Sequence, residues 1–97
     1  MEDNRMNELE QYRKEIDEID QELTRLFELR LNTVLKVGRY KKQRNLPVLD
    51  ASREQAVIEK NISRLTDKTF EPQVTKLFQS MMDITKETQT ALLKSEP

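Results

Sequence analysis

Five polar side chains of this 97-residue chain lie at positions where the helical repeat calls for apolar residues. They come from three separate segments and comprise two cations, a carboxylate, a hydroxyl and an amide: Arg30, Lys41, Glu54, Thr85 and Gln89. Burying a polar group without a partner costs on the order of several kcal/mol. The two positive charges exceed the single negative charge of the carboxylate, and a small anionic ligand would neutralise the excess. The five side chains therefore indicate a binding site for such a ligand.

Each of these residues also has an ordinary structural explanation. A long cation such as Arg30 can lie along apolar surface with its charged end in water. A carboxylate in the first turn of a helix is common, and a threonine inside a helix often bonds its own backbone. The argument for a site rests on three segments offering inward polar groups together.

Arg13 extends the argument to a second copy of the chain. It precedes Arg30 by about 17 residues, which is roughly 25 Å along a helix axis, so one small ligand cannot touch both from the same helix. In an antiparallel pair of helices, Arg13 of one chain could reach the Arg30 site of the other. An equal alternative is that Arg13 is a solvated charge near Glu10 and Asp17.

A site of this kind would bind two anionic groups with forked arginines. It would direct Lys41 and Gln89 at a neutral oxygen and let Glu54 accept from a hydroxyl. The chain has no cysteine and no histidine, and it shows no nucleophile beside a base, no metal-ligand cluster and no glycine-rich phosphate loop. The chemistry that fits is a rearrangement needing only positioning and charge stabilisation, without a metal or cofactor.

The elements that must position these side chains are all expected to be helices. One glycine and three prolines leave little turn chemistry for hairpins. Apolar residues at three- and four-residue spacing predict a long helix over about 8–44, a short one over 51–65 and a medium one over 72–93. The chain is therefore expected to be a single all-α domain over residues 1–97.

Several local signals mark the ends of these helices. Pro47 disfavours helix at the residue before it, and Pro72 suits the first position of a helix. Asp50 or Ser52 can cap the second helix, and Ser52 with Gln55 fits a capping box. Gly38, inside the first helix, indicates either simple tolerance or close approach by another element.

The length of the first helix indicates a dimer. A helix of about 34 residues is a rod roughly 50 Å long. A compact chain of this size has a radius of gyration of only about 13 Å, so the rod extends beyond such a globule. The remaining residues cannot cover the apolar stripe of such a rod. A second copy can, so an obligate, intertwined homodimer is expected.

Composition excludes several classes of partner. The formal net charge of −1 gives no general attraction to nucleic acid or to an anionic membrane. No segment approaches the roughly 20 apolar residues of a membrane span, and the acidic N-terminus does not resemble a signal peptide. The absence of cysteine fits a cytoplasmic protein. The short tails favour a free-standing enzyme over one domain of a longer polypeptide.

Segments spread from about Leu9 to Leu93 share one joint pattern: Tyr12 to Asp17 with Asp20 and Leu23, Arg30 with Val37 to Lys41, Pro47 to Asp50 with Arg53 and Glu54, and Leu77 to Gln79 with Thr85 and Gln89. Together they resemble the AroQ-type chorismate mutases, although no single piece is specific. The resemblance implies an isomerase that converts chorismate to prephenate by a Claisen rearrangement, on the pathway to phenylalanine and tyrosine. It also implies an intertwined all-helical homodimer with two shared sites.

The resemblance further implies a role for each candidate residue. Arg13 from the partner chain and Arg30 would bind the two carboxylates of the substrate, with Thr85 assisting. Lys41 and Gln89 would bond the ether oxygen, and Glu54, with Asp50 nearby, would hold the ring hydroxyl. The family often has serine at the Thr85 position and a basic residue at the Leu49 position, so the chain departs from the pattern at both.

Two alternatives remain open on the sequence. An isochorismate-pyruvate lyase is similar in fold and keeps the cations, but the presence of Glu54 favours the mutase. A non-catalytic helical dimerisation module would use Arg30 and Lys41 only to set the register of the helices. Comparing turnover on chorismate with turnover on isochorismate distinguishes a mutase from a lyase. A bicyclic dicarboxylate should raise the melting temperature of an enzyme but not that of a dimerisation module.

Overall fold

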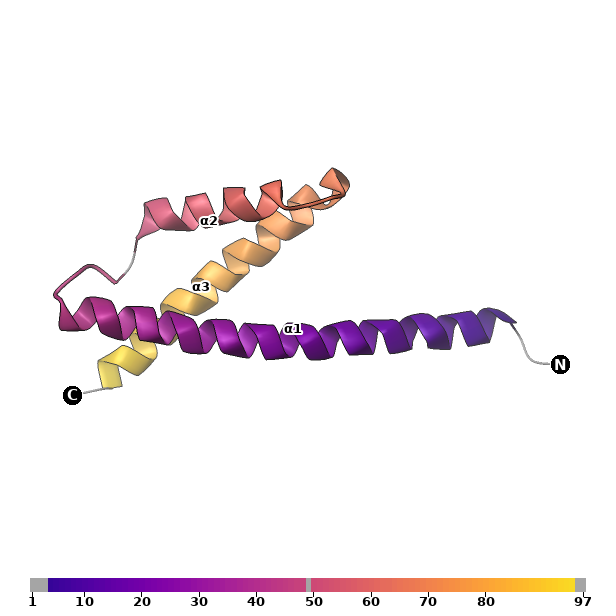
Figure 1. Ribbon diagram of the computed structural model, residues 1–97, viewed down its shortest axis with the longest axis horizontal. Coiled ribbons are helices and arrows are strands. Elements are labelled where there is room, and N and C mark those ends of the chain that lie inside the picture. Colours follow the sequence, from indigo (N-terminus) through magenta and orange to yellow (C-terminus); the bar gives the residue numbers. More distant parts are fainter. Residues whose placement is uncertain (1–3, 49, 96–97) are drawn as a thin grey trace. The chain divides into compact units, whose positions relative to one another are not determined.

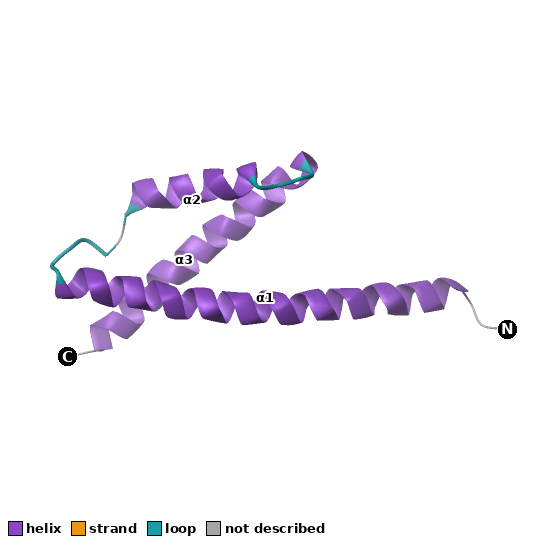
Figure 2. Ribbon diagram, viewed as in Figure 1, coloured by secondary structure: helices purple, strands orange, loops and turns teal. Residues whose placement is uncertain are grey.

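The computed structural model describes residues 4–48 and 50–95, with the side chains of 4–6, 92 and 93 left aside. In that part of the chain all regular structure is helical: α1 (Asn4–Gln43), α2 (Ala51–Ser63), the short 3-10 helix η1 (Lys68–Phe70) and α3 (Glu71–Ser95) (Figures 1 and 2). The α-helices have 40, 13 and 25 residues. The predicted all-α class, with one long, one short and one medium helix, is confirmed.

The helices extend further than the apolar pattern alone indicates at three ends: the start of α1 and both ends of α3. α1 begins at Asn4 rather than near residue 8, since good helix formers such as Glu8 and Leu9 occupy this end. α3 begins at Glu71, which places Pro72 in its first turn, and continues to Ser95. η1 lies in the polar segment between α2 and α3, where Asp67 accepts from the backbone N–H of Thr69 at 3.0 Å.

The C-terminal end of α1 is closed by a Schellman motif. Asn45 has φ 57°, in the left-handed region that asparagine tolerates. This turn directs the N–H of Leu46 to the carbonyl of Lys41 at 2.8 Å and the N–H of Asn45 to the carbonyl of Lys42 at 3.2 Å. Arg44 also stacks on the ring of Tyr40, 3.7 Å from its centroid. The backbone at Lys41 is therefore held by a defined helix end.

Asp50 alone is the N-cap of α2, which decides between the two caps that the sequence allowed. Its carboxylate accepts from the backbone N–H of Arg53 at 3.2 Å and from the hydroxyl of Ser52 at 2.7 Å. The capping box of Ser52 with Gln55 does not form, because Ser52 lies inside the helix and Gln55 donates to Glu59 at 3.2 Å.

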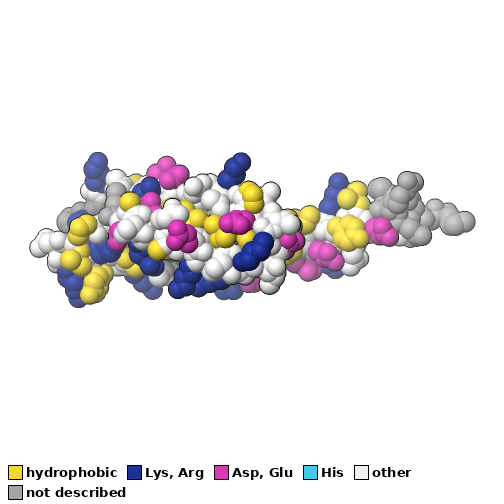
Figure 3. All heavy atoms as spheres, turned by 90° about the horizontal axis from the view of Figure 1, so that it is seen from above, with side chains coloured by type: hydrophobic (Ala, Val, Ile, Leu, Met, Phe, Trp, Pro, Cys, Tyr) yellow, Lys and Arg dark blue, Asp and Glu magenta, His cyan; other side chains and the backbone are white. Residues whose placement is uncertain are grey.

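The chain divides into two units, Met1–Asn32 and Thr33–Pro97, which we describe separately. In the first unit, the apolar stripe of α1 lies exposed: Tyr12, Ile16, Ile19 and Leu23 are each 56–58% accessible to solvent. Figure 3 shows hydrophobic side chains, in yellow, on the surface near the N-terminal end of the chain. A single helix cannot bury its own stripe, so this surface is uncovered within the first unit.

The second unit contains the small core, in which α2 packs on α3 (Figure 1). Ile58 of α2 and Met82 of α3 are buried, at 7% and 8% exposure. Around them lie half-buried side chains from both predicted stripes: Val57, Ile62, Leu65, Val74, Phe78 and Met81. Leu77, three residues after Val74, has the spacing of this apolar stripe but is 52% exposed. Leu92 and Leu93 also have this spacing, but they lie outside the described side chains.

No helix in the described ranges is both long enough and apolar enough to cross a membrane.

Candidate active site

The seven candidate residues are divided between the two units. Arg13 and Arg30 belong to the first unit, and the other five, Lys41, Asp50, Glu54, Thr85 and Gln89, belong to the second. Within the second unit, specific contacts connect the candidates to α1, α2 and α3, as described next.

Gln89 is the buried polar residue of α3, with 5% of its surface exposed. Its side-chain nitrogen Nε2 donates to the carbonyl oxygen of Val34 in α1 at 2.8 Å. An amide group carries two N–H donors, so this bond uses one of them and fixes the plane of the group. The residue that the sequence placed in an apolar stripe is thus buried and hydrogen-bonded.

Gly38 explains how α3 can reach a carbonyl inside α1. It is buried and lies one turn after Val34. In an α-helix, the side chain of a residue points back over the turn before it, toward the carbonyl four positions earlier. A Cβ atom at position 38 would therefore crowd the Val34 carbonyl, and glycine leaves that oxygen open to Gln89. The structure supports close approach over simple tolerance as the role of Gly38.

Glu54, in the first turn of α2, pairs with a cation from α3. The ammonium nitrogen Nζ of Lys86 lies 3.4 Å from Oε1 and 3.5 Å from Oε2 of Glu54. The same nitrogen lies 3.5 Å from Oδ1 of Asp83, one turn earlier on α3. The carboxylates of Glu54, which has the larger effect, and of Asp83 raise the pKa of Lys86 above its ordinary value. Glu54 therefore lies against a fixed positive charge.

Sequence reasoning missed Lys86, although a signal for it was present. Lys86 continues the row of four-residue steps made by Phe78 and Met82, which face the core, and it directly follows Thr85. It is thus a further polar residue at an inward position of α3. Because exposed lysines are common on helices, its pairing with Glu54 required the packing of α2 on α3 to be known.

A cavity of about 350 Å³ opens between α2 and α3 beside Glu54. Its lining is mixed: Ala51, Ile58 and Met82 are apolar, and Glu54, Gln55, Gln79 and Asp83 are polar. Glu54 thus pairs with Lys86 and also borders a space that could hold a ligand group.

Lys41 and Asp50 lie close enough to interact through their charges. The pKa of Asp50 is lowered first by the hydroxyl of Ser52, then by the backbone N–H of Arg53, and further by the positive charge of Lys41. Lys41 is half-buried, whereas Asp50 is exposed. The end of α1 and the start of α2 therefore bring a cation and a carboxylate to one place.

Thr85 is half-buried and lies one turn before Gln89 on α3. Two other threonines of this helix donate to their own backbone, Thr75 to Glu71 at 2.8 Å and Thr88 to Ile84 at 2.7 Å. These two show the ordinary behaviour expected of threonine in a helix. The shared position of Thr85 and Gln89, one turn apart, presents a hydroxyl and an amide from the same side of α3.

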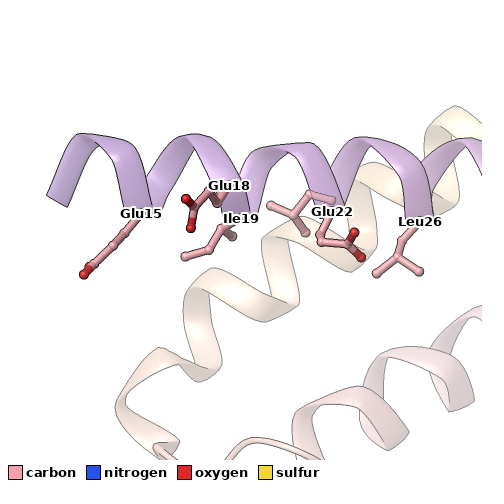
Figure 4. Close-up of a pocket in the computed structure, with 6 residues that line it drawn as sticks. Glu15, Glu18, Ile19, Glu22 and Leu26 are labelled. Carbon is pink, nitrogen blue, oxygen red and sulfur yellow. The ribbon is translucent and has the colours of Figure 1, made fainter. Parts of the chain in front are cut away.

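In the first unit, Arg13 is exposed and Arg30 is half-buried. Close to Arg13 along α1 is an open hollow of about 480 Å³, lined entirely by this helix: Glu15, Glu18, Ile19, Glu22, Leu23 and Leu26. Figure 4 shows five of these residues pointing from one side of α1. Apolar side chains flanked by carboxylates thus form an uncovered surface, beside which Glu22 and Arg25 make an exposed ion pair of 2.9 Å.

No group of three or more Asp and Glu side chains comes together in the described part of the chain in a way that could hold a metal ion.

Comparison with known proteins identifies the family to which the chain is similar. Residues 12–90, which include all seven candidates, match the family model described as chorismate mutase type II. The chain is 40% identical over 65 residues, 67% of its length, to a bifunctional chorismate mutase/prephenate dehydratase of Aquifex aeolicus. It is 43% identical over 54 residues, 56% of its length, to the T-protein of Haemophilus influenzae.

The chain spans 18% and 14% of the lengths of these two relatives. No solved structure matches it at the level of significance applied.

Proposed function

The chain belongs to the chorismate mutase type II family, and we propose that it catalyses the rearrangement of chorismate to prephenate. In this Claisen rearrangement a C–O bond breaks and a C–C bond forms within one molecule, so no atom is gained or lost. The single observation that carries the proposal is the family match, which spans all seven candidate residues. The proposal treats residues 1–97 as one catalytic domain in the cytoplasm.

The proposed catalytic step is stabilisation of the charge that develops on the ether oxygen as the C–O bond breaks. The second N–H of the Gln89 amide and the ammonium of Lys41 would donate to this oxygen. The bond from Gln89 to Val34 supports this role because the amide is already oriented before the substrate binds. Donors that need no reorganisation stabilise a transition state most effectively.

Glu54 would accept a hydrogen bond from the ring hydroxyl of the substrate. The cavity beside Glu54 supports this role, as does the mixed polar and apolar character of its lining. Asp50, which caps α2 and interacts with Lys41, would complete the polar side of the site. None of these groups needs to transfer a proton, so the proposed mechanism involves no acid–base or covalent step.

Arg30 would bind one carboxylate of the substrate with help from Thr85, and Arg13 of a second chain would bind the other. We infer a homodimer with shared sites because the stripe of α1 is exposed along the first unit. A helix of 40 residues is about 60 Å long, and a second copy of the same helix offers a stripe of matching length.

The proposal is tested by incubating the purified chain with chorismate and identifying the product. We expect chorismate to disappear and prephenate to form without added metal or cofactor. Loss of isochorismate with release of pyruvate, at a rate exceeding that on chorismate, would identify a lyase instead. A folded protein that turns over neither compound, and whose melting temperature is unchanged by a bicyclic dicarboxylate, would support a dimerisation module.

A further inference from the structure

The contact between Lys86 and Glu54 differs from the other ion pairs of the helices. Glu22 and Arg25 lie within one turn of a single exposed helix, and such pairs contribute little. Lys86 and Glu54 come from different helices, and their side chains are only 38% and 26% exposed. Partial burial weakens screening by water and salt. The pair therefore constrains both side chains more than a surface contact would.

The geometry of the pair fixes the carboxylate of Glu54 as a whole. Nζ of Lys86 lies at nearly equal distances from the two oxygens, 3.4 Å and 3.5 Å. A carboxylate has about four lone-pair positions, so the shared ammonium leaves capacity on both oxygens for a further donor. Asp83, 3.5 Å from the same nitrogen, holds the ammonium from its own helix. The carboxylate is thus held by Lys86 and can still accept further hydrogen bonds.

Glu54 of α2 and Asp83 of α3 both line the cavity between these helices. A glutamate in a cavity has several rotamers, and a donor can use only those that point toward it. The ammonium of Lys86 next to Glu54 favours the rotamers that keep the two groups in contact.

We propose that Lys86 is a positioning residue for the reaction: it holds the carboxylate of Glu54 in the orientation that accepts a hydrogen bond from the ring hydroxyl of the substrate. This inference rests on the proposed function. Lys86 acts through Glu54 and does not itself contact the substrate. Its effect on turnover therefore depends on the carboxylate at position 54.

The test is a double-mutant cycle made from Lys86→Met and Glu54→Gln, with kcat and KM for chorismate measured for all four proteins. Glutamine keeps an acceptor oxygen but no charge, so Glu54→Gln should remain measurably active. We expect Lys86→Met to lower kcat/KM by about 10-fold beside Glu54 and by less than about 2-fold beside Gln at position 54. Lys86→Arg keeps the cation and should restore most of the activity.

Lys76→Met is the matched control, because Lys76 is an exposed lysine on the same helix; it should leave kcat/KM unchanged. Circular dichroism and melting temperature show whether each variant is folded, and Lys86→Gln replaces Lys86→Met if the latter unfolds. An equal loss from Lys86→Met in both backgrounds would show that Lys86 acts on the substrate or the fold, and would overturn the proposal. No loss beside Glu54 would also overturn it. Inactivity of the unmodified chain on chorismate would instead refute the proposed function.

Discussion

The side chain of Gln89 donates to the backbone carbonyl of Val34 at 2.8 Å, although the two residues lie on different helices. A carbonyl inside an α-helix already accepts from the N–H four residues later, here that of Gly38. The oxygen of Val34 can accept a second bond because a carbonyl has two lone pairs and because Gly38 places no side chain over it. The orientation of a proposed catalytic amide therefore depends on a glycine that does not touch it.

Replacing Gly38 with alanine is expected to lower kcat by about 10-fold while leaving the chain folded. Alanine normally stabilises an exposed helix position by about 1 kcal/mol relative to glycine, but a Cβ atom here would crowd the approach of Gln89 to Val34. The melting temperature should therefore rise less than helix propensity alone predicts. Enzyme assays and thermal unfolding measure both effects.

Asn32→Ala is the control for this prediction, since Asn32 is an exposed position on the same helix. It should raise the melting temperature slightly and leave turnover unchanged. If Gly38→Ala matched this control in both measurements, Gly38 would have no role in orienting Gln89.

Lys41→Ala is expected to reduce kcat/KM by about 100-fold or more, since a donor to the developing negative charge is lost. Arg30→Ala should cause a comparable loss by removing a carboxylate contact. The matched control is Lys36→Ala, an exposed cation on α1, which should change kcat/KM by less than about 2-fold. Near-normal activity of either site variant would show that its assignment is wrong.

Mixing Arg13→Ala chains with Arg30→Ala chains tests whether sites are shared between protomers. Each variant alone should be weakly active. After unfolding and refolding together, about half of the dimers contain one chain of each kind, and each such dimer has one intact site. Activity should then return to about a quarter of the unmodified level. Absence of recovery, with dimers confirmed by sedimentation, would place Arg13 outside the site of the partner.

The cap on α2 should make stability depend on pH through Asp50. The hydroxyl of Ser52, the N–H of Arg53 and the charge of Lys41 lower the pKa of Asp50 in the folded chain. The ionised cap therefore stabilises the fold above the unfolded pKa of about 3.9, and this contribution is lost as the pH falls through the lower folded value. Asp50→Asn keeps a capping side chain but does not titrate.

The melting temperature of the unmodified chain should exceed that of Asp50→Asn near pH 6, and the difference should shrink as the pH is lowered toward about 3. Ser52→Ala removes the largest cause of the shift and should move the loss of stability to higher pH. A difference between the two proteins that did not change with pH would contradict a role for the charge of Asp50.

Helical periodicity, which is a local property, predicts five of the seven candidate residues: Arg30, Lys41, Glu54, Thr85 and Gln89. Three- and four-residue spacing identified the stripes that contain Ile58 and Met82, both of which are buried, and it singled out Gln89 as a polar interruption. The place of Asp50 and Ser52 before α2 also indicates that one of them is its cap. These predictions succeeded because capping and amphipathicity depend on residues only a few positions apart.

The tertiary structure decided the contacts between residues that lie far apart in the chain. The pairing of Lys86 with Glu54 and the bond from Gln89 to Val34 depend on how α3 packs, which no local pattern specifies. The same packing leaves Leu77 exposed, although its spacing matched the stripe. Sequence alone therefore determined which residues are unusual for their helices, whereas the packing of those helices determined their partners. The physical reason is that a helix fixes the direction of a side chain but not what lies opposite it.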